Sequence, residues 1–85
     1  MSNQEIGFRT LVNVIGVDFY RSHKDNVVFS WEEEDDGLYC FLGITLHPEK
    51  SRPTLTAKAD DWDIYASCYV SKNGGITMDV CRLPS

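Results

Sequence analysis

A chain of 85 residues has room for one domain with a small hydrophobic core, and folding leaves it little margin of stability. Hydrophobic residues make up 42% of the sequence and charged residues 25%, which excludes extended disorder and a fibrous fold. The formal net charge of −5 argues against nucleic acid and anionic membrane surfaces as partners, because both are negatively charged. We therefore expect residues 1–85 to form a single globular domain.

The start of the chain and its cysteines bear on the cellular compartment. Residues 1–10 lack the basic and apolar regions of a secretory signal, and no apolar run approaches the ~18 residues of a membrane span. Cys40, Cys68 and Cys81 have unrelated spacings and form no Cys-x-x-Cys motif. An odd number of such cysteines fits a reducing compartment better than a disulfide framework. The sequence therefore predicts a cytoplasmic protein.

The first element along the chain is predicted to be a helix. Ser2 and Glu5 have the spacing of a capping box, in which each side chain bonds the backbone amide of the other. Apolar residues then recur at helical spacing, and Gly16 supplies a C-terminal stop. These apolar residues are Phe8, Leu11, Val12 and Ile15. Several residues between 10 and 17 are β-branched and favour a strand, so both structures stay open for residues 8–20.

The following segments are predicted to be strands. Residues 17–20 form a short apolar segment that ends in a turn-rich stretch. Residues 27–32 and residues 38–46 alternate between inward and outward side chains with a period of two. This pattern is typical of strands with one face on a hydrophobic core.

Five consecutive carboxylates at residues 32–36 lie between these two strands. We expect them at the tip of a hairpin, because the apolar pattern stops before them and resumes after them. A four-residue loop over residues 33–36 would place Trp31 opposite Leu38, which keeps both apolar sets on one face. So many like charges in adjacent positions repel one another unless a cation or a basic surface offsets them.

The second half of the chain begins with a polar connection over residues 47–61, whose role the sequence does not assign. Residues 62–70 then alternate as a strand, with Trp62 on the inward side. The segment Lys72-Asn73-Gly74-Gly75 is the clearest turn in the chain. A three-residue loop with a left-handed glycine would align Val70 with Ile76 and bury the apolar residues of both strands together.

These elements predict an α+β fold, in which a single N-terminal helix packs on a four- to five-stranded antiparallel sheet. If residues 8–20 form a strand, the alternative is a small all-β barrel. In either arrangement Cys40 and Cys68 point into the core, whereas Cys81 lies on the opposite face.

The candidate site combines the acidic tip with aromatic residues on the outward face of the sheet. Tyrosine-rich exposed patches mark interfaces, and a carboxylate run attracts basic surfaces. The predicted partner-binding residues are Glu33, Glu34, Asp35, Asp36, Tyr39, Phe41, Tyr65 and Tyr69. The alternatives are that the acids only solvate a hairpin end, and that the sheet curls to bury both faces.

The function that fits these features is protein binding, with a basic protein as the partner and the chain as an inhibitor or immunity-type protein. One alternative is a homo-oligomeric accessory domain without a ligand, because an aromatic patch also favours self-association. Another is a small-ligand-binding domain that uses Asp61 and Asp63 with Tyr65 and Tyr69 beside the connection at residues 47–61.

Catalytic and metal-binding patterns are weak throughout the sequence. Residues 32–37 imitate part of a calcium-binding EF-hand loop, but the twelfth position is Gly43 instead of a bidentate glutamate. His23 and His47 have no zinc-ligand spacing to each other or to the cysteines. We therefore expect no enzyme activity, no cofactor and no resident metal.

Overall fold

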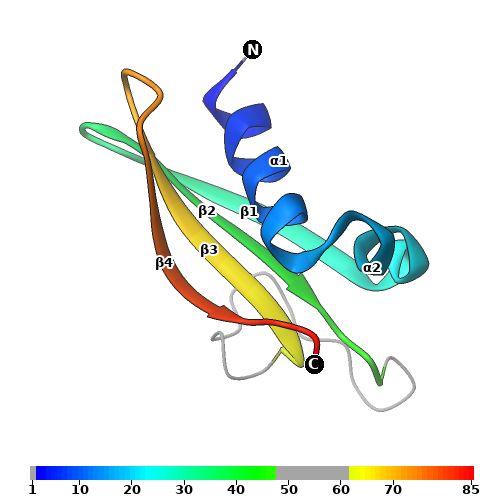
Figure 1. The fold of residues 1–85 in the computed structure, drawn as a ribbon. Helices are drawn as coiled ribbons and strands as arrows, with labels where there is room; N and C mark the ends of the chain where they lie inside the picture. Colours follow the sequence, from blue (N-terminus) through cyan, green and yellow to red (C-terminus); the bar gives the residue numbers. More distant parts are fainter. Residues whose placement is uncertain (1, 48–61) are drawn as a thin grey trace.

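The computed structural model describes residues 2–47 and 62–85, where one main helix packs on a four-stranded antiparallel sheet (Figure 1). The helices are α1 (Asn3–Ile15) and α2 (Val17–Ser22), followed by a 3₁₀ turn, η1 (Lys24–Asn26). The strands, in chain order and in sheet order, are β1 (Val27–Glu34), β2 (Gly37–Ile44), β3 (Ile64–Ser71) and β4 (Ile76–Arg82). The predicted α+β fold is confirmed. The alternative of a closed barrel is wrong, because β1 and β4 are the free edges of an open sheet.

Helix α1 begins and ends where the sequence predicts. The Ser2 Oγ accepts a hydrogen bond from the Glu5 N–H at 3.2 Å and so caps the N-terminus. Gly16 follows the last turn with a φ of +115°, which residues with a side chain rarely adopt. No helix in the described part of the chain is long and apolar enough to cross a membrane.

The predicted strand over residues 17–20 is wrong, because these residues belong to α2. The carbonyl of Gly16 accepts a hydrogen bond from the Tyr20 N–H at 2.9 Å and starts this second helix. The Tyr20 ring then packs edge-on against Phe8, with centroids 5.7 Å apart. Packing of this ring against the core outweighs the strand propensity of Val17, which is 38% exposed.

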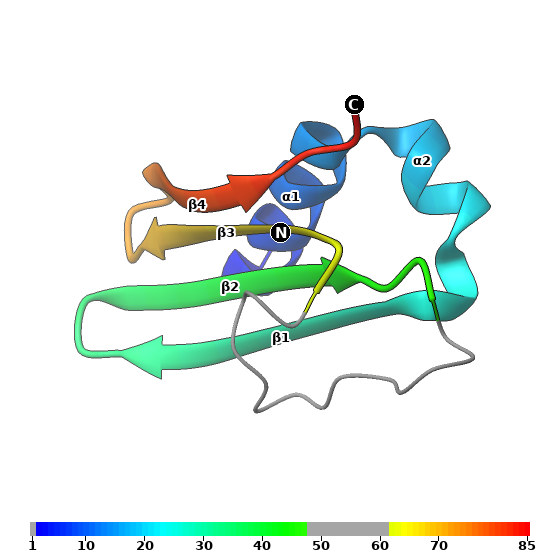
Figure 2. The same cartoon turned by 90° about the horizontal axis from the view of Figure 1, so that it is seen from below.

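The core lies between α1 and the two central strands, β2 and β3 (Figure 2). Cys40 and Cys68 face each other directly across these strands, and both are fully buried, as predicted. Burial raises the pKa of the Cys40 thiol to about 11, and the neighbouring Cys68 adds to the effect. The other buried apolar residues of this core are Leu11, Val12, Ile15, Leu38, Leu42, Ile44, Ile64, Ala66 and Val70.

The hairpin between β1 and β2 is tighter than predicted. Glu34 pairs with Gly37, so only residues 35–36 lie in the turn. Trp31 therefore pairs with Cys40, two residues from its predicted partner. This shift keeps every side chain on its predicted face, because the alternation has a period of two. The Trp31 ring is 45% exposed, however, because β1 is an edge strand.

The turn between β3 and β4 is the predicted three-residue loop. Gly74 has a φ of +88°, and the Ser71 N–H donates a hydrogen bond to the Gly75 carbonyl at 2.8 Å. Val70 pairs with Ile76, as predicted. A turn that depends on local residues of this kind is recognisable from sequence alone.

Farther along these strands a β-bulge changes the predicted pairing. Ala66 pairs with Cys81 instead of Val80, because β4 contains one extra residue here. The Ser67 Oγ accepts a hydrogen bond from the Val80 N–H and donates one to the Val80 carbonyl, both at 3.3 Å. The extra residue reverses the alternation of β4, so Cys81 lies on the same face as Ala66. The prediction that Cys81 faces the opposite way is therefore wrong.

The contact between α1 and the sheet predicts the effect of enlarging Gly7. A Cβ atom at this position would overlap the Cys40 Sγ, so Gly7→Ala should destabilise the protein. The expected loss is about 1–3 kcal/mol, offset in part by the ~1 kcal/mol higher helix propensity of alanine. Urea unfolding measures the difference.

The exposed Asn13→Ala, in the same helix, serves as the control and should be neutral or slightly stabilising. The cost of Gly7→Ala should also shrink in a Cys40→Ala background, because the overlapping sulfur is gone. An equal cost in both backgrounds would contradict the contact.

Candidate functional site

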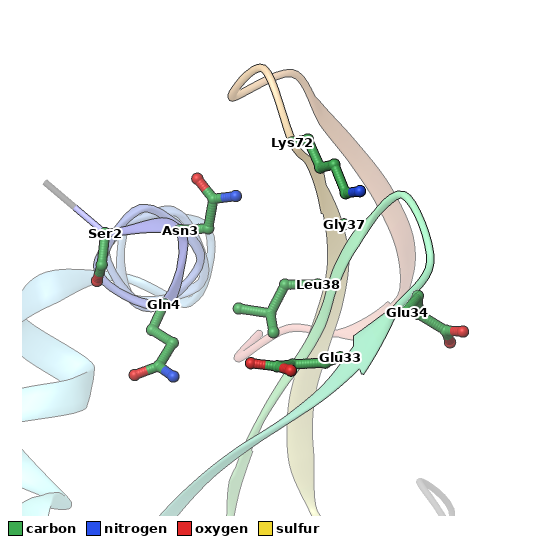
Figure 3. A pocket seen from close by; sticks show the side chains of 8 residues that line it. All are labelled: Ser2, Asn3, Gln4, Glu33, Glu34, Gly37, Leu38 and Lys72. Carbon is green, nitrogen blue, oxygen red and sulfur yellow. The ribbon is translucent and has the colours of Figure 1, made fainter.

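The exposed acidic run is divided between the two faces of the sheet. Glu33 pairs with Leu38, whose side chain lies in the core under α1. Glu32 and Glu34 therefore point to the opposite face, because side chains alternate along a strand. Figure 3 shows the Glu33 side chain extending toward the first turn of α1 and the Glu34 side chain extending away from it. Asp35 and its neighbour Asp36 form the turn itself.

Glu33 lines a hollow of about 420 Å³ between the N-terminus of α1 and the hairpin tip (Figure 3). Asn3 closes one side, where its Nδ2 donates a hydrogen bond to the Ser71 carbonyl at 3.3 Å. Glu33 therefore faces the first turn of α1, whereas Glu32 and Glu34 lie on the other face. The full lining is Ser2, Asn3, Gln4, Glu33, Glu34, Gly37, Leu38 and Lys72.

On the face away from α1, two tyrosines lie side by side next to the acids. Tyr39 pairs with both Glu32 on β1 and Tyr69 on β3, so the three residues form one row across the sheet. The Tyr39 hydroxyl donates a hydrogen bond to the Asp79 carboxylate and lies 3.1 Å from the Ser67 Oγ. Both tyrosines are half-buried, whereas the carboxylates around them are exposed. We call Glu32, Glu34, Tyr39, Tyr69 and Asp79 the acidic tyrosine face.

The surroundings of the two tyrosines raise the pKa of each. Burial raises the pKa of Tyr39 above its ordinary value of 10.0, and the hydrogen bond to Asp79 adds to this. Partial desolvation is the main cause that raises the pKa of Tyr69. The negative charges at the hairpin tip raise this pKa further, and Asp36 contributes most among them. Both phenols therefore keep their protons at neutral pH. They act on this face as hydrogen-bond donors, not as bases.

Farther from the tip, the same face carries an aromatic cluster. Phe41 stacks on Tyr65 with centroids 6.2 Å apart and lies 6.1 Å from Trp62. The Trp62 ring covers Gly43, where a Cβ atom would lie 2.6 Å from the ring. The predicted inward position of Trp62 is therefore wrong. Its side chain is only 2% exposed, but it lies on the face opposite α1, because Trp62 precedes β3 and does not follow its alternation.

The eight predicted partner-binding residues thus fall into three groups. Glu34, Asp35, Asp36, Tyr39 and Tyr69 lie at the tip or on the acidic tyrosine face. Glu33 is turned toward α1, and Phe41 and Tyr65 pack together in the aromatic cluster, where Tyr65 is only 9% exposed.

Sequence reasoning left out Glu32 and Asp79. Alternation along β1 predicts that Glu32 lies on the outward face, but its pairing with Tyr39 depends on the two-residue turn, which the predicted loop did not contain. The contact of Asp79 could be predicted only from the order of the strands, because its partner Tyr39 lies two strands away.

The small-ligand alternative uses two carboxylates, of which only Asp63 lies among the described residues. Asp63 accepts a hydrogen bond from the Leu46 N–H at 2.7 Å, which ties the start of β3 to the end of β2. Asp61 lies outside the described residues. Within residues 2–47 and 62–85, no group of three or more His, Cys, Asp or Glu side chains is placed to hold a metal ion. His23 stacks on Phe19 at 4.2 Å, at the end of α2.

Comparison with known proteins gives no relative. The chain matches no family model, no curated protein and no solved structure.

The charges at the hairpin tip predict a measurable change in Tyr69. Changing Glu34, Asp35 and Asp36 to Gln or Asn should lower the pKa of the Tyr69 phenol, which an NMR titration measures. A raised folded-state pKa stabilises the fold below the unfolded value near 10, and this stabilisation is lost as the pH rises through the folded value. The variant should therefore lose less stability than the wild type in this range.

The phenol of Tyr39 is the internal control, because the tip carboxylates do not contribute to its raised pKa. Its pKa should stay unchanged in the tip variant and fall in Asp79→Asn. A Tyr69 pKa that does not respond to the tip charges would contradict the arrangement of this face.

Proposed function

We propose that this protein is a small acidic protein-binding module that recognises a basic partner through the acidic tyrosine face and the hairpin tip. The observation that supports this most strongly is the row formed by Glu32, Tyr39 and Tyr69 across the sheet. It combines exposed negative charge with tyrosine rings at one end of the face away from α1. The two kinds of side chain that favour a protein interface with a basic surface are therefore adjacent.

The chemistry of this face suits arginine in particular. Carboxylates accept charge-assisted hydrogen bonds from a guanidinium group, and tyrosine rings stack against its plane. The protein already makes one contact of this kind on the same face, where the Arg82 guanidinium lies 5.8 Å from the Tyr65 ring centroid. An arginine-rich segment of a partner would meet the same combination of groups at Tyr39 and Tyr69.

The role that we propose is that of an inhibitor or immunity-type protein in the cytoplasm. A net charge of −5 on a small chain steers it toward basic surfaces over a distance of about one Debye length, ~8 Å in physiological salt. The three free cysteines are consistent with a reducing compartment. By covering a basic site on its partner, such a protein would block access to that site.

Affinity capture from a lysate of the source cells tests the proposal with two variants of equal charge. The first carries Glu32→Gln, Glu34→Gln and Asp36→Asn on the acidic tyrosine face and tip. The second changes three exposed acids elsewhere, Glu5→Gln, Asp18→Asn and Asp25→Asn. Each variant changes the net charge from −5 to −2, because three negative charges are removed.

We expect the wild type and the second variant to recover the same basic protein, and the first variant to lose it. Calorimetry with the purified partner should show a loss of affinity of roughly three- to a hundredfold for the first variant, since each of the three exposed charge pairs contributes roughly 0.2–1 kcal/mol. Binding by the wild type should weaken as salt rises. Equal recovery by both variants would refute the proposed face.

A further inference from the structure

The edge strand β4 is exposed along its whole length. Ile76 and Met78 pair with core residues of β3, so they lie on the same face as α1. The helix packs on β2 and β3, and these two side chains stay 43% and 41% exposed. Leu83 extends this apolar surface and is 44% exposed, whereas Val80, which is 47% exposed, lies at the bulge on the face away from α1. A long apolar edge of this kind is a template for pairing with another strand.

Charge determines which strand can pair with this edge. The other edge, β1, ends in three consecutive glutamates, residues 32–34, and charged side chains on an edge strand discourage pairing with another strand. Strand β4 carries one acid, Asp79, and one base, Arg82, and has no net charge. Pairing of β1 with β4 of another copy would leave two free edges and grow without closing. Pairing of β4 with β4 closes after two copies.

The β-bulge also makes β4 self-complementary. Thr77 and Arg82 lie on the face away from α1, whereas Met78 and Cys81 lie on the face of α1, as their partners on β3 show. In a regular strand Met78 and Cys81, three residues apart, would point to opposite faces. The extra residue at the bulge places Met78 and Cys81 on the same face. Because alternation continues on both sides of the bulge, Ile76 and Leu83 also lie on that face.

We propose that two copies of the chain associate through antiparallel pairing of their β4 strands, around a two-fold axis between residues 79 and 80. Met78 then lies opposite Cys81 of the second copy, and Thr77 opposite Arg82 of the second copy. Each pair shares a face, as opposite residues in an antiparallel ladder must. This interface does not depend on the proposed partner, and it shares only Asp79 with the acidic tyrosine face.

Two further contacts favour this register. Ile76 lies opposite Leu83 of the second copy, so the exposed apolar side chains on the face of α1 meet one another. Asp79 lies diagonally across from Arg82 of the second copy, which is within reach of long side chains and places opposite charges together. Both contacts occur twice, because the axis is two-fold. The surface thus has apolar and charge complementarity to itself.

Light scattering coupled to size-exclusion chromatography tests the association. The wild type should have twice the mass of the 9.7 kDa chain, and Met78→Lys should have the mass of one chain. Val17→Lys changes an apolar residue of similar exposure on α2 and should leave the dimer intact. Circular dichroism shows whether each variant is folded. A wild type that stays monomeric up to about 1 mM, or a folded Met78→Lys dimer, would overturn the proposal.

Cysteine crosslinking tests the register. In Met78→Cys, oxidised glutathione should join the new cysteine to Cys81 of the second copy, with two thiols oxidised to one disulfide and glutathione reduced. Within one chain the two positions lie roughly 10 Å apart along an extended strand, beyond disulfide reach. Thr77→Cys faces the other way and should not crosslink to Cys81. Equal crosslinking of both variants, or crosslinking of neither, would overturn the proposed pairing.

Discussion

The packing of α1 against the two central strands determines which surfaces of this protein a partner can reach. Gly7 lets the helix approach Cys40 closely, and this contact commits one face of β2 and β3 to the core. On the opposite face, aromatic side chains pack against the sheet in place of a helix. Gly43 serves there as Gly7 does on the helix side, because its missing side chain makes room for the ring of Trp62. One small residue on each face thus allows a large group to settle on the sheet.

The two edges of the sheet differ because the helix covers only its centre. On β1 the edge ends in carboxylates, which keep other strands away and attract basic groups. On β4 the edge is apolar and carries a bulge. The two free edges therefore suit different partners, one through charge and the other through strand pairing. They lie at opposite edges of the sheet, and Asp79 on β4 belongs both to the acidic tyrosine face and to the edge that would pair.

The sequence predicts most of the fold, and the errors share a physical cause. The cap at Ser2, the stop at Gly16 and the loop at Gly74 depend on local residues, and all three are where they were predicted. Residues 17–20 form a helix because Tyr20 packs against Phe8, a contact that local propensity does not contain. The bulge depends on hydrogen bonds from Ser67, which belongs to another strand.

The candidate site is predictable to a similar degree. Alternation places Tyr39 and Tyr69 on the face away from the helix, and the register makes them neighbours. The register also places Glu33 in β1, on the face opposite to Glu32 and Glu34. The predicted loop had grouped residues 33–36 together and so did not separate Glu33 from the other acids. The bond from Tyr39 to Asp79 crosses an intervening strand, and it exists because the residue between them is the small Ser67. Such a contact follows from strand order, which no single segment specifies.

Chemical labelling of the opposed thiols of Cys40 and Cys68 can report how often the core opens. Both are fully buried, and a pKa of about 11 for Cys40 keeps that thiol protonated, so alkylating reagents have no thiolate to attack while the sheet is closed. Cys81 is exposed in the single chain, so it should be labelled before the two buried cysteines. The slower labelling of the other two then measures how often α1 lifts from the sheet. A bound partner that holds the fold shut would lower that rate, even if it touched neither cysteine.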